Sequence, residues 1–135
     1  MPNILKTLLI IIGSMIAGGV MVGVVQTLSH HLYPTPTGID FKDPDALATY
    51  MTQVPLGAKV WVVASWAIGM TTGAGLALFL SGRQMLPATI TIGLLLGATC
   101  TNFFTIPHPI WMIVSAFLVA FLVWLGAKQV ANSTR

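Results

Sequence analysis

The chain contains no glutamate and few charged side chains of any kind, with six Lys or Arg and three Asp among its 135 residues. Charged residues make up 7% of the sequence and hydrophobic residues 56%, whereas an average soluble domain has roughly 25% charged residues. Such a chain cannot cover a water-facing surface, so we expect a lipid bilayer to be its solvent. The net charge of +3 comes without a basic cluster that could meet phosphates, which excludes nucleic acid as a partner.

Cysteine occurs once, as Cys100. A single cysteine excludes an internal disulfide and a Cys-x-x-Cys redox pair, and we interpret Cys100 as a small packing residue. No Ser-His-Asp spacing or phosphate-binding loop is visible. The sequence therefore favours a non-enzymatic role, with a hydrolase acting at the membrane surface as an alternative.

Acidic and basic side chains are also missing from the middle of every long apolar segment. Ion- and proton-coupled carriers place such groups there despite the free-energy cost, because transport needs them. The small multidrug transporters have a similar size and four spans, but they depend on a membrane-embedded glutamate that this chain lacks. Coupled transport of that kind is therefore disfavoured.

Four apolar segments are long enough to cross the hydrocarbon of a bilayer, which takes about 20 residues in a helix. They cover approximately residues 4–28, 56–80, 87–104 and 109–126. The first is too long for the apolar region of a cleaved signal peptide, and Gly126 is expected to end the last. These segments predict an all-α membrane protein, with four transmembrane helices in an antiparallel bundle that forms one integral membrane domain over residues 1–135.

The segment 29–55 is the only long connection between predicted spans. In it, Asp43 and Pro44 are typical of a helix start, because the carboxylate caps free N–H groups and proline suits the first helical position. The apolar residues that follow recur at i, i+3, i+4 and i+7, which is one face of a helix. We predict a short amphipathic helix that lies on the membrane surface and ends before Pro55.

Positive side chains are distributed unequally between the two sides of the predicted bundle. They are Lys6, Arg83, Lys128 and Arg135 on the side of the termini, and Lys42 and Lys59 on the other side. Because cytoplasmic loops carry the excess of Lys and Arg, we expect both termini in the cytoplasm of a bacterium and the chain in its inner membrane. The long connection 29–55 then faces outward.

Small residues recur at a spacing of four, which lets transmembrane helices approach closely. The predicted packing positions are Gly19, Gly23, Gly69, Gly73, Gly93 and Gly97, with Ser14 and Gly18 as a further pair. The two motifs Gly19-x-x-x-Gly23 and Gly93-x-x-x-Gly97 each precede a Pro-x-Pro, and Trp61-x-x-x-Ser65 matches Trp111-x-x-x-Ser115. This pattern suggests two duplicated helical hairpins. The alternative is that membranes select the same residues in unrelated spans.

Polar and aromatic side chains gather where the first and third spans end. The candidate ligand-binding residues are Gln26, His30, Asn102, His108, Trp61, Trp66 and Trp111. An aromatic recess with a few amides and imidazoles would suit a lipid headgroup, a quinone or a neutral solute. The alternative is that Gln26 and Asn102 hydrogen-bond between helices and that the tryptophans form an ordinary interfacial belt.

The three histidines, His30, His31 and His108, also allow a metal- or haem-binding site. Neighbouring His30 and His31 diverge by about 100° on a helix, so at most one readily faces a given centre. No spacing among the three matches a known metal motif, and the identity of any cofactor stays unknown.

The chain resembles small four-span proteins of bacterial inner membranes. The matching residues are Ser29-His30-x-x-Tyr33-Pro34-x-Pro36-x-Gly38-x-Asp40 and Ile106-Pro107-His108-Pro109-x-Trp111. The resemblance implies four spans and a bacterial setting but no activity. We therefore expect a non-enzymatic accessory subunit or a small carrier or binder, in contact with membrane lipids, that assembles with itself or with a larger membrane complex. The alternative is a metal-, haem- or quinone-binding redox component.

Overall fold

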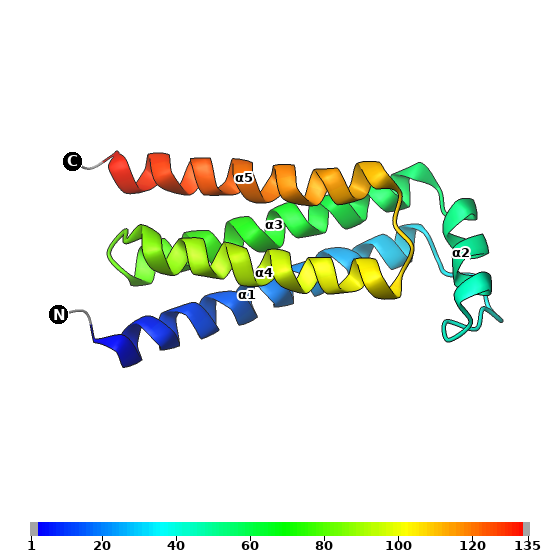
Figure 1. The fold of residues 1–135 in the computed structure, drawn as a ribbon, viewed down its shortest axis with the longest axis horizontal. Helices are drawn as coiled ribbons and strands as arrows, with labels where there is room; N and C mark the ends of the chain where they lie inside the picture. The colour runs from blue at the N-terminus through cyan, green and yellow to red at the C-terminus, as the bar shows by residue number, and fades with distance from the viewer. Residues whose placement is uncertain (1–2, 134–135) are drawn as a thin grey trace.

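The computed structural model describes residues 3–133, and these residues form helices and connecting loops with no strand. Four long helices lie side by side, and one short helix lies across one end of them (Figure 1). The helices are α1 (Ile4–Leu32), α2 (Pro44–Gln53), α3 (Leu56–Leu80), α4 (Met85–Thr105) and α5 (Ile110–Asn132). All but α2 are long and apolar enough to cross a membrane. The predicted all-helical bundle with an amphipathic helix in its first long connection is confirmed.

The bundle is antiparallel, so the first and last described residues lie at the end opposite α2 (Figure 1). Helices α3 and α4 each contact the three other spanning helices, whereas α1 and α5 do not contact each other, and the most extensive contact is between α1 and α3. The turn between α3 and α4 is tight, since Gly82 and Arg83 both adopt a φ of 67°. The connection between α4 and α5 is equally short and contains Pro107 and Pro109.

Large apolar side chains cover the outside of the bundle, among them Ile16, Leu118 and Phe121, which are each more than half exposed. The interior instead contains small residues such as Ala77 and Ala116, which are fully buried. Lipid provides no hydrophobic drive for helices to associate, so close packing through small side chains must hold them together. The distribution of exposed and buried residues is that of a protein surrounded by hydrocarbon.

The backbones of α1 and α3 approach each other closely where the two helices cross. A Cβ added at Gly18 would lie 2.7 Å from the carbonyl oxygen of Gly69, and one added at Gly73 would lie 3.1 Å from the carbonyl oxygen of Ser14. The backbones of the two helices therefore touch through Ser14, Gly18, Gly69 and Gly73. Here the absence of a side chain is required by the distance between the helices.

The other predicted packing glycines, Gly19, Gly23, Gly93 and Gly97, do not pack against another helix of the chain. A Cβ added at any of them would meet no atom within 4 Å. Successive residues of a helix point in directions that differ by about 100°, so a glycine next to a packing position faces another way. The register Ser14–Gly18 faces α3, so Gly19 and Gly23 face elsewhere.

Several helix ends differ from the sequence-based boundaries. Helix α1 continues to Leu32, so Ser29 and His30 belong to its last turn rather than to a loop. Helix α5 does not end at Gly126 but continues to Asn132. A glycine inside a helix costs only about 1 kcal/mol relative to alanine, and Ala127 and Ala131 on the same helix are buried. Burial of the last turns outweighs the helix-breaking tendency of the glycine.

Candidate ligand-binding recess

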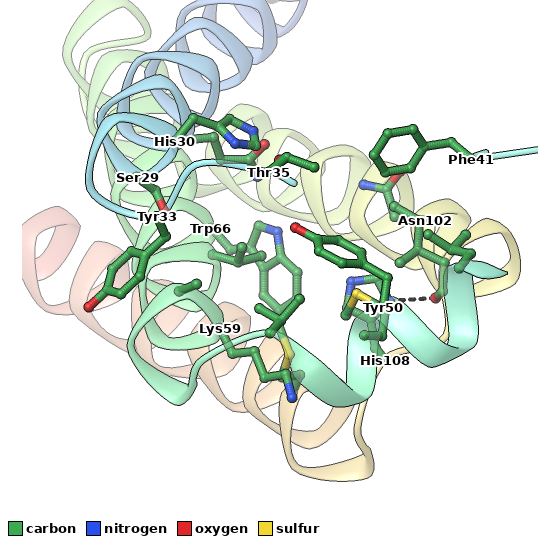
Figure 2. A pocket seen from close by; sticks show the side chains of 18 residues that line it. Ser29, His30, Tyr33, Thr35, Phe41, Tyr50, Lys59, Trp66, Asn102 and His108 are labelled. Carbon is green, nitrogen blue, oxygen red and sulfur yellow. Dashed lines mark hydrogen bonds between the residues drawn. The ribbon is translucent and has the colours of Figure 1, made fainter. Parts of the chain in front are cut away.

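A recess of about 450 Å³ lies between α2 and the adjacent end of the bundle. All five helices and three of their connections contribute to its lining. Figure 2 shows Tyr50 of α2 and Trp66 of α3 pointing into it, with Lys59 at its edge. The other lining residues include Gln26, Ser29, His30, Tyr33, Thr35, Phe41, Leu47, Met51, Ala58, Asn102, His108 and Met112.

Helix α2 forms the cover of the recess. It begins as the sequence predicts, with the Asp43 carboxylate accepting a hydrogen bond of 3.0 Å from the Asp45 N–H and with Pro44 in the first turn. Its apolar face, with Leu47 and Tyr50, lines the recess. Among the described residues, no Cα of α2 lies within 8 Å of a Cα in another helix. The cover is thus held over the bundle by side chains and by its two connections.

Trp66 and His108 form the aromatic floor of the recess, and Phe103 packs against both of them without lining the recess. Trp66 is only 3% exposed, and its ring centroid lies 5.8 Å from that of Phe103 and 6.1 Å from that of His108. Phe103 and His108 meet edge to face at 5.1 Å. These rings come from α3, α4 and the connection that follows α4. The floor is therefore formed by the Trp66 indole, with the His108 imidazole as its polar part.

The orientation of His108 is determined by the backbone beside it. Its Nδ1 lies 2.7 Å from the carbonyl oxygen of Ile106 (Figure 2). Because a carbonyl only accepts, Nδ1 carries the proton, and a neutral imidazole keeps a lone pair on Nε2. Prolines 107 and 109 stiffen the chain on both sides of the ring. His108 therefore offers a hydrogen-bond acceptor to a molecule in the recess.

The amide groups that line the recess differ in their environment. Gln26 Nε2 donates to Ser65 Oγ over 3.2 Å, and the Ser65 hydroxyl donates to the Val62 carbonyl over 2.6 Å, which ties α1 to α3. Gln26 therefore serves as interhelical glue as well as lining. The Asn102 side chain makes no hydrogen bond to any described residue and is exposed at the end of α4. It is available to a bound molecule.

The charge of the recess is positive. Lys59, in the first turn of α3, is the only charged residue among those that line it, and no Asp or Glu lines it in the described chain. The carboxylate of Asp40 accepts from the Lys42 N–H, and Asp43 caps α2, so both bond within the connection that leads to α2.

A smaller groove of about 180 Å³ adjoins the recess on the side of the bundle interior. Gln26, Trp66 and Asn102 line both cavities. Away from these shared residues, the groove runs between α1, α3 and α4 and is almost entirely apolar. Its further lining residues are Gly19, Val22, Met70, Leu95, Ala98 and Thr99.

The structure brings together Gln26, His30, Asn102, His108 and Trp66 from the predicted binding residues. Trp61 and Trp111 do not join them. Trp61 precedes Trp66 by five residues and so lies about 140° away around α3, beside Leu56 and Val60. Trp111 is 40% exposed, whereas its neighbour Met112 is buried and lines the recess. Both excluded tryptophans lie on outward faces of their helices.

Sequence reasoning did not assign Tyr33, Tyr50 and Lys59 to the recess. The position of Tyr50 could have been predicted in part, because it lies on the apolar face of the predicted surface helix, and that face must pack against lipid or protein. For Lys59, the sequence indicates only its charge and the end of the bundle at which it lies. The position of Tyr33 depends on a long-range contact, since a Cβ added at Gly57 of α3 would collide with its hydroxyl.

The three histidines do not converge on one centre. His31 Nδ1 lies 2.8 Å from the carbonyl oxygen of Thr27, and the ring is exposed on α1 outside the recess. In the part of the chain that the structure describes, no three His, Cys, Asp or Glu side chains are placed to hold a metal ion. His30, His31 and His108 therefore form no three-ligand cluster, as expected for consecutive helical residues that diverge, and a metal- or haem-binding role of single histidines stays a prediction.

No protein-family model, curated protein or solved structure matches the chain. The main functional feature of the structure is the recess, which combines an aromatic floor, amide and imidazole groups, one cation and an adjoining apolar groove.

Proposed function

We propose that this chain is a non-enzymatic membrane protein that binds a lipid or another amphipathic small molecule in the recess under α2. The observation that carries the proposal is the recess of about 450 Å³, lined by all five helices, with polar groups gathered against an apolar floor. Binding sites for small molecules have this composition, with a few placed polar groups in a mainly apolar cavity. Such a protein would act as a small carrier or as the ligand-binding subunit of a larger assembly.

We place the protein in a bacterial inner membrane with both termini in the cytoplasm. Four helices long and apolar enough to span support a multi-pass protein. The direction of insertion rests on the excess of Lys and Arg at the end of the termini, which includes Lys6, Arg83 and Lys128 in the described chain and Arg135 outside the described residues. The recess then opens at the outer leaflet. Assembly with itself or with a larger partner stays a prediction.

The test uses the full chain purified from membranes in a mild detergent, with native mass spectrometry to detect lipid that remains bound. Thr35 lines the recess from the connection before α2, whereas Thr37 on the same connection is exposed and does not line the recess. We expect Thr35→Trp to abolish the retained mass because the indole occupies the recess. The matched control Thr37→Trp should retain as much lipid as the unmodified chain. Equal retention in all three proteins would contradict the proposal.

A further inference from the structure

We propose that the recess and its adjoining groove together hold one phospholipid with an anionic, hydroxyl-bearing headgroup. The phosphate lies beside Lys59, and one acyl chain enters the groove between α1 and α4. This inference rests on the proposed function and adds the chemical class of the ligand.

The charge expected for the bound headgroup follows from the residues that line the recess. Two of the spanning helices end and two begin at this face of the bundle, so their dipoles largely offset one another. The side chains then decide, and Lys59 is their only charge, with no described carboxylate among the lining residues. A cationic headgroup would meet Trp66 and Tyr50, whose rings favour cations, but it would also meet the ammonium group of Lys59, beside which no carboxylate lines the recess. A phosphate is the complementary partner.

The remaining polar groups favour a headgroup that has hydroxyls. His108 presents Nε2 as an acceptor, because its Nδ1 proton is held by the Ile106 carbonyl. The Asn102 side chain, which has no described partner, offers both a donor and an acceptor. A glycerol headgroup can donate to the imidazole and bond with the amide in both directions. A quaternary ammonium headgroup has no hydrogen to donate to either.

The adjoining groove provides the place for an acyl chain. It meets the recess at Gln26, Trp66 and Asn102, so a molecule whose polar end lies in the recess can continue into it. The residues that line the rest of the groove are mainly apolar. Gly19 lines it without a side chain, and a Cβ added there would meet no atom within 4 Å, so the space in front of Gly19 is open. A free phosphate or a soluble sugar phosphate would leave this groove empty. Continuity of a polar recess with an apolar groove therefore favours a lipid.

The experiment reconstitutes the full chain in vesicles or nanodiscs of phosphatidylcholine that contain phosphatidylglycerol, and it measures retained lipid by native mass spectrometry. We expect enrichment of phosphatidylglycerol over its share of the bilayer. Lys59→Gln should lower its apparent affinity about tenfold, as loss of a charge-assisted hydrogen bond does, whereas Lys59→Arg should keep the preference. Gly19→Leu should reduce retention by filling the groove, and Gly23→Leu, at another exposed glycine of α1, should not.

The outcomes separate this inference from the proposed function. If phosphatidylcholine is retained equally well and Lys59→Gln changes nothing, while Thr35→Trp abolishes retention, the recess binds a ligand but the anionic class is wrong. If soluble glycerol phosphate competes as strongly as the lipid and Gly19→Leu has no effect, the recess binds a free anion, and the inference that its ligand is a phospholipid is wrong. If the unmodified chain retains neither lipid, both proposals fail. Circular dichroism of each variant confirms that the helices are intact.

Discussion

At the residue scale, the distinction between neighbouring glycines determines what each one does. Gly18 lies at the crossing of α1 and α3, whereas Gly19 points to open space beside the groove. Both are preceded and followed by apolar residues in the same helix. The sequence around the two glycines does not show which one packs against α3. Substitutions at Gly18 and Gly19 can therefore be compared to measure the contact between α1 and α3.

We expect Gly18→Ala to destabilise the folded bundle by about 1–3 kcal/mol, the usual cost of overpacking. The added methyl would lie 2.7 Å from the backbone oxygen of Gly69, which cannot move without separating the helices. Gly19→Ala should be neutral or stabilising by up to about 1 kcal/mol, because alanine favours the helix. Unfolding in mixed detergent micelles with increasing dodecyl sulfate measures both. Equal stability of the two variants would show that α1 and α3 do not cross at Gly18.

The rotation of each helix is the part of the site that could not be predicted from the sequence. A span surrounded by lipid is apolar on the lipid side and on the protein side, so hydrophobic periodicity does not reveal which face packs. Trp61 and Trp66 were therefore equivalent candidates, although only Trp66 lines the recess. The polar residues Gln26, Asn102 and His108 were predictable, because polar groups near the end of a span need a partner or an aqueous recess.

At the element scale, α2 was predictable in position and in its beginning, because capping by Asp43 and the Pro44 at the first turn are local signals. Its relation to the bundle was not predictable, since the apolar face of a surface helix can meet lipid or protein. The structure turns Leu47 and Tyr50 of this face toward the recess. The helix thus covers a cavity as well as lying across the end of the bundle (Figure 1).

The cap of α2 should control how well the recess is closed. Asp43→Ala removes the acceptor for the Asp45 N–H and should destabilise α2 by about 1 kcal/mol. We expect faster amide hydrogen exchange in the first turn of α2 and faster loss of bound lipid. Asp43→Asn, which preserves the acceptor, should behave like the unmodified chain. Unchanged exchange in Asp43→Ala would mean that α2 is stabilised mainly by its side-chain contacts with the bundle.

At the scale of the whole molecule, the number of spans and their antiparallel order followed from segment length and short turns. The extensive contact between α1 and α3 did not, because it depends on which faces of the two helices carry small residues. Helix α3 buries Ser65, Gly69, Gly73 and Ala77 along its length, and α1, α4 and α5 all pack against it. The recess lies at one end of α3, where residues of α1, α4 and α5 line it together with Trp66.

The direction of insertion is a property of the whole chain, and it decides which side of the membrane supplies the ligand. In a Cys100→Ala background, Thr37→Cys lies on the connection before α2, and Gln84→Cys lies at the opposite end of the bundle; both positions are exposed. Since the excess of Lys and Arg is expected to stay in the cytoplasm, a membrane-impermeant maleimide added to intact inner-membrane spheroplasts should label position 37 and not position 84. Permeabilised cells should show labelling at both positions, which controls for reactivity. Labelling of position 84 alone in intact spheroplasts would reverse the orientation and move the recess to the cytoplasmic leaflet, where a carrier would load from the opposite side.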